Sequence, residues 1–202
     1  MQTSLSSHNL QSVCVFCGSS DAADPDFLVD AARLGEALAQ AKLTLVYGGG
    51  GVGLMGACAR AAHEAGGKVL GVIPDFLVAR ERAYDEVETM VVASMHERKR
   101  MMFERSDAFA VLPGGVGTLE EVVEILSWRR LGLHAKPVVF HNPKAFWSPL
   151  FELLQHTVDQ SLTPPDFMRT FSAVERIEDL VPALRAAVPT GPDTVPAAMR
   201  VT

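Results

Sequence analysis

The strongest constraint on the fold is the alternation of short apolar segments with longer segments of helical periodicity. The short segments are rich in β-branched residues and apolar on both faces, as required of parallel strands covered by helices on both sides. Strands are expected at Val13–Phe16, Leu43–Tyr47, Val69–Ile73, Met90–Ala93, Ala108–Leu112, Val138–Phe140 and Phe171–Val174. Helices are expected at Asp26–Ala41, Leu54–Ala65, Met95–Arg105, Leu119–Leu131, Ala145–Gln160 and Glu175–Ala187. This order predicts an α/β fold, namely a doubly wound, Rossmann-like parallel sheet flanked by helices in a single domain.

Length and composition fit one such domain with loose ends. The chain has 202 residues, 48% hydrophobic and 21% charged, which argues against a disordered chain or a disulfide scaffold. No repeat or low-complexity linker interrupts the alternation before about residue 188. We therefore predict a flexible N-terminus at residues 1–11, a domain at residues 12–188 and a disordered, Pro-rich tail at residues 189–202.

The net charge and the lack of targeting signals in the sequence limit the classes of partner that this protein is expected to bind. The net charge of −6 gives no overall basic field for nucleic acid or an acidic membrane surface. The N-terminus lacks the charged and apolar regions of a secretory signal, and no segment reaches the apolar length of a transmembrane helix. Three cysteines, an odd number at low density, suit a reducing compartment. We expect a cytoplasmic protein that binds neither nucleic acid nor membrane.

Three of the predicted strands are followed by glycine-containing loops: Cys17–Ser20, Gly48–Gly53 and Pro113–Thr118. The carboxyl ends of parallel strands meet at one edge of the sheet, so these loops should lie close together where such folds bind ligands. Glycine lets backbone N–H groups approach an anion, and the next helix N-terminus is partly positive, so each loop can cradle a phosphate. A single glycine after a strand, such as Gly18, is more often only a turn.

Two other phosphate-binding motifs fit less well. The segment Gly51–Gly56 matches the dinucleotide pattern GxGxxG, and Asp75 follows a strand at a tolerable distance, so NAD binding is one hypothesis. However, this match follows the second strand instead of the first, and it gives no role to the loop at Pro113. The segment Gly114–Thr118 lacks the Gly-Lys-Ser/Thr ending of a Walker-type loop.

Two cations flank the core-facing stripe of one predicted helix. The segment Ser94–Glu97 has the Ser-x-x-Glu form of a capping box, which predicts that a helix begins at Met95. At about 100° per residue, Arg98 and Lys99 lie beside the apolar stripe, whereas Arg100 points away. An arginine there needs a partner, because burying an unpaired guanidinium is costly. It is either half of an internal ion pair or a cation that binds an anionic ligand.

A second capping box is expected after the third glycine loop. The segment Thr118–Glu121 has the required form with Glu121 at its fourth position, so the simplest role of Glu121 is to cap the helix. Glu120, Glu121 and Glu124 are expected on the polar side of this helix, and only the first two lie where the loops converge. A functional carboxylate there would act on ribose hydroxyls or on water. The apolar stripe expected to face the sheet is Leu119, Val122, Val123 and Leu126.

No metal site and no covalent nucleophile is expected. Cys14 and Cys17 have CxxC spacing, but residues three apart on a strand point to opposite faces. No second cysteine or histidine pair has ligand spacing, and neither HExxH nor GxSxG occurs.

The residues around the last two motifs resemble a known family. Met95–Lys99, which carries an Arg-Lys pair, and Pro113–Glu121, of the form PGGxGTxxE, are similar to the paired signature of the LOG family of cytokinin riboside 5′-monophosphate phosphoribohydrolases. The resemblance extends over residues 12 to 188. Many members carry the label lysine decarboxylase, but no setting for a pyridoxal-binding lysine is evident. Further matches are Val15–Ser20, Tyr47–Gly50, Gly53–Gly56, Gly71–Pro74, Trp128, Leu131–His134 and Lys136–Pro137.

This resemblance implies hydrolysis of the N-glycosidic bond of an N6-modified AMP to the free base and ribose 5-phosphate. It implies Arg98 and Glu121 as the catalytic pair, no metal or organic cofactor, and a homodimer with the site near the subunit interface. Departure of the base leaves positive charge on the ribosyl group, which a carboxylate can stabilise while it activates water. The substrate-binding residues expected from the resemblance and the glycine loops are Gly18, Ser19, Gly48, Gly49, Glu81, Lys99, Gly114, Gly115, Val116, Gly117, Thr118, Leu119, Glu120 and Ser127.

Two departures from the family pattern leave the base preference open. Val116 stands where many relatives carry Tyr, and Ser127 where many carry Thr. The alternatives are a broader nucleosidase acting on purine nucleoside 5′-monophosphates such as AMP and GMP, and a non-catalytic carrier of a nucleotide or of the molybdenum cofactor. The role of Arg98 also stays open among positioning the substrate, positioning the carboxylate and assisting the leaving group.

Overall fold

The computed structural model describes residues 10–189 and contains every strand and helix expected from the sequence. The flexible ends predicted at residues 1–11 and 189–202 lie almost entirely outside the described residues. The strands are β1 (Ser12–Phe16), β2 (Thr44–Tyr47), β3 (Val69–Pro74), β4 (Glu88–Val92), β5 (Ala108–Val111), β6 (Val138–His141) and β7 (Ser172–Val174). The helices are α1 (Pro25–Gln40), α2 (Gly53–Glu64), α3 (Met95–Glu104), α4 (Val116–Arg130), α5 (Ser148–Asp159) and α6 (Leu180–Ala186). Short 3-10 helices occur at η1 (Asp75–Leu77), η2 (Pro143–Ala145), η3 (Phe167–Arg169) and η4 (Ile177–Asp179).

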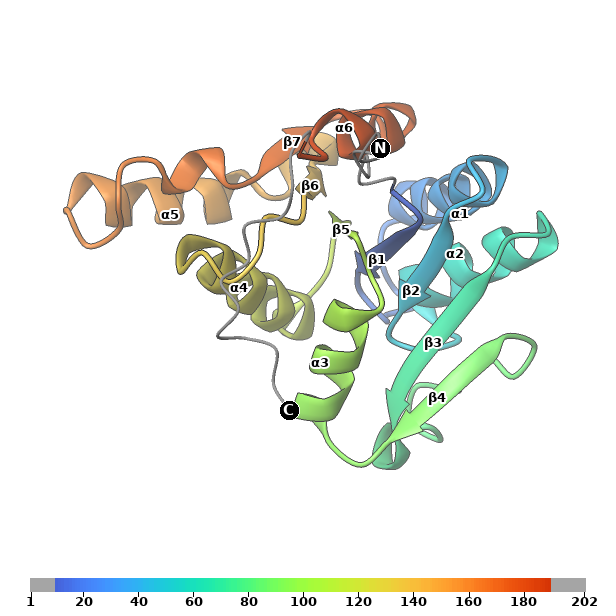
Figure 1. Cartoon of the computed structure of the whole chain (residues 1–202). Helices are drawn as coiled ribbons and strands as arrows, with labels where there is room; N and C mark the ends of the chain where they lie inside the picture. The colour runs from blue at the N-terminus through green and yellow to red at the C-terminus, as the bar shows by residue number, and fades with distance from the viewer. Residues whose placement is uncertain (1–9, 190–202) are drawn as a thin grey trace, which may run out of the picture.

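All seven strands form one parallel sheet in the order β4-β3-β2-β1-β5-β6-β7, which confirms the predicted fold class. The chain builds the sheet outward from β1 to β4, and then returns to the other side of β1 with β5. Figure 1 shows β4 at one edge of the molecule and α5 at the opposite end. The carboxyl ends of β1 and β5 are therefore the point where the connections change direction, and folds of this kind bind ligands there.

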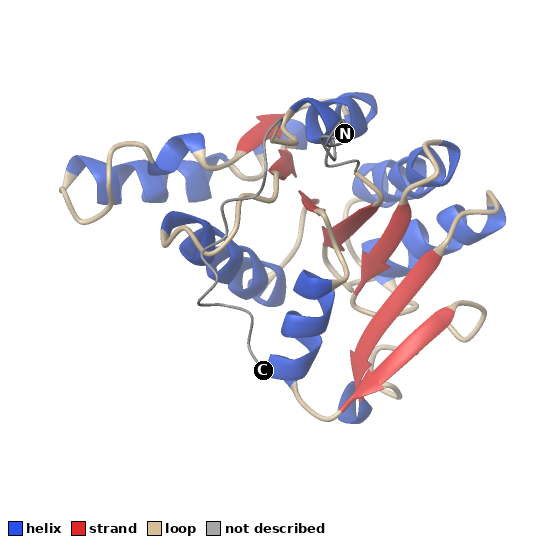
Figure 2. Cartoon of the chain, viewed as in Figure 1, coloured by secondary structure: helices blue, strands red, loops and turns tan. Residues whose placement is uncertain are grey.

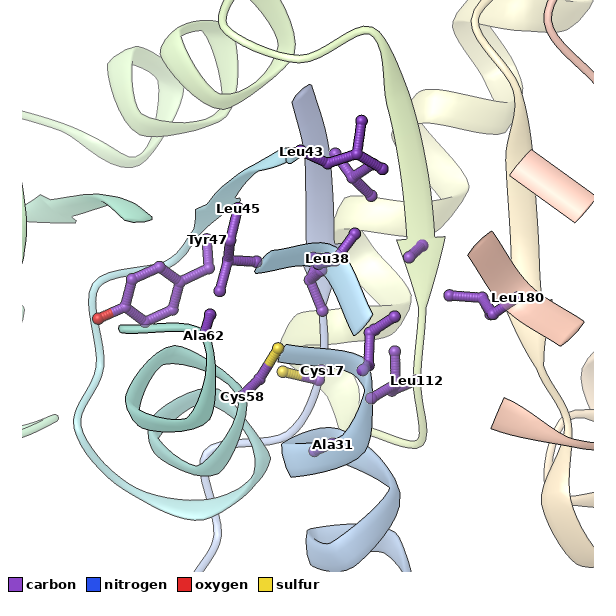
Figure 3. Packing of buried hydrophobic residues seen from close by; sticks show 14 of the residues in the cluster. Cys17, Ala31, Leu38, Leu43, Leu45, Tyr47, Cys58, Ala62, Leu112 and Leu180 are labelled. Carbon is purple, nitrogen blue, oxygen red and sulfur yellow. The ribbon is translucent and has the colours of Figure 1, made fainter. Parts of the chain in front are cut away.

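Helices cover both faces of the sheet, as the apolar strands require (Figure 2). On one face α1, α2 and α6 pack around residues such as Leu34, Leu45 and Leu180, several of which Figure 3 labels. On the other face α3, α4 and α5 pack around residues that include Phe109 and Phe140. No helix in the described range is long and apolar enough to cross a membrane.

The three cysteines are buried thiols. Cys14 lies in the core under α3 and α4, whereas Cys17 and Cys58 lie in the core under α1 and α2, where Figure 3 shows them. The CxxC pair therefore points to opposite faces, as expected. Burial raises the pKa of all three thiols, that of Cys58 to about 12.

The native protein is accordingly expected not to react with an aromatic disulfide reagent at neutral pH. The thiolate is the reactive form, and burial suppresses both its population and its accessibility. All three thiols should react after denaturation in guanidinium chloride. Absorbance of the released thiol measures both states, and rapid modification of one thiol in the native protein would contradict the expectation.

Candidate functional site

The predicted convergence of the three glycine loops is confirmed, because they follow the neighbouring strands β2, β1 and β5. The N–H of Gly18 donates to the carbonyl of Pro113 over 3.0 Å, and a Cβ on Gly18 would lie 3.4 Å from the Cα of Gly114. The carbonyl of Gly18 accepts from the N–H groups of Leu54 and Met55 at 3.0 and 3.3 Å. The loops after β1 and β5 thus touch, and the loop after β1 also covers the start of α2.

The GxGxxG segment is used for packing within the chain. The N–H of Gly53 donates to the carboxylate of Asp21 over 2.8 Å, and the next two amides of α2 donate to Gly18. Gly53 has φ +57°, and a Cβ there would lie 2.5 Å from the carbonyl carbon of Ser19. The first donors of α2 are therefore taken by the loop that holds Ser19, which removes the support for a dinucleotide pyrophosphate at this helix.

The N-terminus of α4 is open. The helix begins at Val116 with Gly115 as its N-cap residue, so the predicted capping box at Thr118 is wrong. Thr118 is instead buried in the first turn, where a Cβ on Gly114 would lie 2.2 Å from its Oγ1. Nothing lies within 4 Å of a Cβ added at Gly115 or Gly117, and the side chain of Val116 is 84% exposed. This helix start, unlike that of α2, has the space and the N–H groups to bind an anion.

The prediction that Glu121 lies on the polar side of α4 is also wrong. Glu121 is only 5% exposed, whereas Val123, expected on the core side, is 48% exposed. The buried stripe of α4 contains two polar residues, Thr118 and Glu121, together with Val122, Ile125 and Leu126. A helical wheel based on the apolar residues predicts the wrong buried face for this helix, because the inner face meets polar groups of the neighbouring elements as well as the core.

Arg98 is the cation whose charge most strongly lowers the pKa of that carboxyl. Helix α3 begins at Met95 as predicted, with the hydroxyl of Ser94 accepting from the N–H of Glu97. The side chain of Arg98 is buried, and its Nε and Nη2 donate to the carbonyls of Val72 and Gly48 at 3.1 and 2.9 Å. These bonds fix the guanidinium at the carboxyl ends of β2 and β3.

Gly48 is required by this arrangement. A Cβ at position 48 would lie 2.0 Å from Nη2 of Arg98, closer than any side chain can come. Gly49, at φ +78°, lies against Ile73 and turns the chain away from the sheet. The second glycine loop therefore makes room for the guanidinium of Arg98.

Glu81 is the carboxylate within reach of Arg98. Its Oε2 lies 3.9 Å from Nη2 of Arg98 and, within the described part of the chain, accepts no hydrogen bond although it is buried. Arg98 thus bonds mainly to neutral carbonyl oxygens and is only loosely paired with an anion. Lys99 is used differently, because its Nζ pairs with Glu120 and, at 3.0 Å, with Glu124. That cluster joins α3 to α4.

The electrostatics of Glu121 are unusual. Burial raises the pKa of its carboxyl to about 7, and the Glu120 and Glu81 carboxylates push in the same direction, whereas the charge of Arg98 opposes them. Its carboxylate accepts no hydrogen bond from the described residues. A carboxyl group that is half ionised at neutral pH, within the electrostatic influence of a fixed guanidinium, can exchange a proton with water or stabilise a cation.

Not every expected binding residue reaches this pair. Ser127 lies six residues beyond Glu121, about 9 Å along the helix axis, on the outer stripe of α4 with Glu120 and Val123. Leu119 is half-buried. No group of three or more residues suited to hold a metal ion occurs among residues 10–189.

Two of the hollows in the described part of the chain bear on where the site lies. One of about 290 Å³ lies at the β1/β5 edge, where Gly18, Gly114 and Gly115 meet Phe27 of α1 and Phe146. A larger hollow of about 850 Å³, lined in part by Lys42, Lys68 and Arg185, contains none of the expected site residues. The smaller hollow therefore adjoins the first and third glycine loops, but neither Arg98 nor Glu121 lines it.

The sequence patterns missed Asp21. This residue accepts the N–H of Gly53 and binds Arg82 at 2.5 Å, so it ties together three loops around the site. The signal available was its place directly after the first glycine loop.

Comparison with known proteins agrees with this geometry. Residues 55–184 match the family model described as "Possible lysine decarboxylase". The chain is 45% identical over 178 residues to the probable cytokinin riboside 5′-monophosphate phosphoribohydrolase LOGL9 of Oryza sativa subsp. japonica, covering 88% of this chain and 78% of that protein. It is 41% identical to the cytokinin riboside 5′-monophosphate phosphoribohydrolase LOG7 of Arabidopsis thaliana, covering 88% of this chain and 82% of the relative.

Among solved structures, the molybdenum cofactor carrier protein of Chlamydomonas reinhardtii superimposes with a TM-score of 0.67 at 22% identity, covering 89% of this chain and 98% of that one. At this identity the likeness concerns the fold alone. The curated relatives, in contrast, are similar in sequence over most of their length and of this chain. The protein belongs to the LOG family, the cytokinin riboside 5′-monophosphate phosphoribohydrolases.

Proposed function

We propose that this protein hydrolyses the N-glycosidic bond of an N6-modified AMP and releases the free base and ribose 5-phosphate. The observation that carries the proposal is the buried carboxyl of Glu121, whose pKa is raised to about 7 beside the fixed guanidinium of Arg98. The activity named for the curated relatives supports it, since they match most of the chain at about 40% identity.

The open start of α4 is the proposed phosphate site. Its first amides have no partner within the helix, and the partial positive charge there favours an anion. Binding the 5′-phosphate at this point would hold the ribose near the next turn of the helix, which carries Glu121. Phosphate binding remote from the reacting bond can then contribute to the rate.

In the proposed reaction the bond between the base nitrogen and C1′ breaks, and the base leaves with the electron pair. The carboxylate of Glu121 stabilises the positive charge that develops on the ribosyl group and takes a proton from the attacking water. The water oxygen bonds to C1′, Glu121 passes the proton it received to the departing base, and its carboxylate is regenerated. Arg98 holds Glu121 partly ionised, because its charge opposes the effect of burial on the pKa of that carboxyl.

Lys99 is poorly suited to the amine chemistry that the label lysine decarboxylase suggests. A lysine that forms a Schiff base must be readily deprotonated. Partial burial alone would lower the pKa of Lys99, but its hydrogen bonds to Glu120 and Glu124 raise it above the usual value. Lys99 therefore stays charged, and we assign it to binding and to the α3–α4 contact.

The test is base release from isopentenyl-AMP, AMP and GMP by the purified protein, quantified by chromatography. We expect isopentenyladenine and ribose 5-phosphate in equal amounts, with faster turnover of isopentenyl-AMP than of the other two. Equal turnover of all three substrates would replace the cytokinin preference with a broader nucleosidase. Tight nucleotide binding without base release would favour a carrier, the function named for the structural neighbour.

The rate is expected to depend on pH through Glu121. The carboxylate is the active form, and the pKa of the carboxyl is raised to about 7, so kcat/KM should rise with pH through about 7 and level off above it. A profile already flat from pH 5 upward would show that Glu121 ionises at its ordinary pKa or that its ionisation does not matter.

We also propose that the protein is a cytoplasmic homodimer. Three large apolar residues are exposed along one stripe at intervals of seven and eight residues, namely Val116 and Val123 of α4 and Leu131 directly after it, at 84, 48 and 56%. The same stripe carries Ser127, which a second subunit could bring into the site. All three cysteines are unpaired thiols, which agrees with a reducing compartment.

Val123→Asp is expected to shift the protein from dimer to monomer, because it places a charge in the middle of the apolar stripe. Light scattering after size exclusion measures the mass, and circular dichroism shows whether the fold is retained. Leu153→Asp, at an exposed apolar residue of α5, is the matched control and should leave the mass unchanged. A folded dimer of the Val123 variant would place the interface elsewhere.

A further inference from the structure

The segment that carries Glu81 lies across the second glycine loop. The N–H of Gly51 donates to the carbonyl of Glu81 over 2.9 Å, and the N–H of Tyr84 donates to the carbonyl of Gly49 over 3.3 Å. Gly50 and Ala83 form an antiparallel bridge between these two hydrogen bonds. We call residues 78–84 the Glu81 segment.

The position of the Glu81 carboxylate depends on the backbone of this segment. Its Oε2 lies 3.9 Å from Arg98 and accepts no hydrogen bond within residues 10–189, so no short bond holds the side chain in place. If the segment moves, Glu81 leaves Arg98, and one of the carboxylates that raise the pKa of Glu121 moves with it. The backbone of the segment thus controls the charge around the proposed catalytic pair.

The segment contains a strained residue. Arg82 has φ +44°, in the left-handed region that residues with a Cβ rarely adopt. Such a conformation persists only where the surroundings hold it, and it occurs often at functional sites. The backbone also approaches closely here, since a Cβ on Gly51 would lie 2.2 Å from the carbonyl oxygen of Arg82.

One side chain outside the segment holds the strained residue. Oδ2 of Asp21 accepts from Nη2 of Arg82 at 2.5 Å, while Oδ1 of the same carboxylate accepts from the N–H of Gly53 at 2.8 Å. Asp21 therefore links the loop after β1, the start of α2 and the Glu81 segment. Both charged side chains are largely exposed, 63% for Asp21 and 69% for Arg82, so the pair can open without disturbing the core.

We propose that Asp21 is a positioning residue. Its ion pair with Arg82, which we call the latch, holds the Glu81 segment over the second glycine loop and so sets the position of Glu81 beside Arg98. The inference rests on the proposed function for its kinetic consequence, but the latch itself is a property of the free protein. When the ion pair is broken, Arg82 can leave its left-handed backbone conformation and the Glu81 segment can move away from the glycine loop. Substrate binding must then bring the segment back, which raises KM more than it lowers kcat.

The test uses Asp21→Asn, Arg82→Gln and their double variant. Asparagine keeps an oxygen that can accept the N–H of Gly53 but loses the charge that holds Arg82. Each single variant is expected to raise KM for isopentenyl-AMP about fivefold, the scale of one exposed ion pair, with kcat nearly unchanged. The double variant should be no worse than either single variant, because both remove the same interaction. Arg82→Lys keeps the positive charge, so its KM should be close to that of the wild type.

Arg80→Gln is the matched control. Arg80 is an exposed arginine of the same segment with no ion pair among the described residues, and its loss changes the net charge equally. An equal rise in KM for Arg80→Gln and Arg82→Gln would overturn the proposal, since long-range attraction of the phosphate would then explain both. Unchanged KM in Asp21→Asn, or effects that multiply in the double variant, would overturn it as well.

A second measurement does not depend on turnover. The amides of Gly51 and Tyr84 bridge the glycine loop and the Glu81 segment, so their hydrogen exchange in the free protein reports whether the segment is closed. We expect both amides to exchange about fivefold faster in Asp21→Asn than in wild type or Arg80→Gln. Unaltered exchange would refute the latch, whereas absence of base release by the wild type would refute only the proposed function.

Discussion

Glu121→Gln is expected to lower kcat/KM for base release by about 10²- to 10⁴-fold, the range for loss of a general base or of a charge that stabilises the transition state. Glutamine has nearly the shape of glutamate, so the buried stripe of α4 should pack as before, but it can neither take a proton from water nor carry a negative charge. The kinetics of base release from isopentenyl-AMP measure the loss. Glu152→Gln, at an exposed position of α5, is the control and should match wild type.

The same variant should be more stable than wild type in alkaline solution. The pKa of Glu121 is raised on folding from 4.5 to about 7, so between these values the folded protein binds a proton that the unfolded chain has released. The free energy of unfolding therefore falls as pH rises through this window, by about 1–3 kcal/mol. Glutamine does not titrate and avoids this loss. A Glu121→Gln protein that is inactive but melts at a lower temperature at pH 8 would indicate a packing defect, and the kinetic result would then say little about chemistry.

Arg98→Lys is expected to lower kcat/KM by about 10- to 10³-fold even though the charge is kept. The guanidinium donates from Nε to Val72 and from Nη2 to Gly48, two carbonyls that a single ammonium cannot reach together. One buried carbonyl then loses its donor, and the charge moves away from Glu121. The loss of a positioned donor at an active site is of this size.

The pH profile separates the two contributions of Arg98. Moving the cation from Glu121 removes an influence that lowers the pKa of this carboxyl, so the rise in kcat/KM should shift to higher pH in Arg98→Lys. Arg100→Lys, on the exposed side of the same helix, is the control for the substitution itself. Wild-type kinetics in Arg98→Lys would mean that only a buried positive charge is needed there.

The arrangement of strands and helices could be predicted because strands that are buried on both faces of a parallel sheet appear in the sequence as short, continuously apolar segments. The start of α3 at Met95 agrees with the sequence to the residue, since Ser94 and Glu97 both favour this start and the structure uses them, whereas the helix ends one residue earlier than expected. The inward placement of Arg98 also followed from its position beside an apolar stripe. In these places local preference and tertiary packing agree.

Helix α4 could not be predicted in the same way. Its first turn contains Val116 and Gly117, which are weak helix formers, and a capping motif two residues later suggests a later start. The helix also turns Glu121 inward and Val123 outward, against the hydrophobic pattern. A periodicity argument assigns polar residues to solvent, so it fails where a carboxyl is buried next to Arg98. The motif resemblance, not periodicity, singled out Glu121.

The position of Asp21 after the first glycine loop is visible in the sequence, but the partners of its carboxylate are not. Its partners, Gly53 and Arg82, are 32 and 61 residues away and come together only because β1, β2 and β3 are adjacent. Interactions between loops of different crossovers depend on strand order and on exact loop conformations. Neither quantity can be read from residue types along one chain.

The buried and the outer stripes of α4 carry different groups, and this difference affects how the specificity of the enzyme can evolve. Its inner stripe holds Thr118 and Glu121, whereas Val116, Val123 and Ser127 lie on the outer side. Substitutions on the outer side leave the inner packing untouched, so they carry little penalty in the stability of the folded subunit, whatever they do to the proposed dimer. Selection could therefore retune which base is accepted through the outer positions while the bond-breaking groups are inherited unchanged.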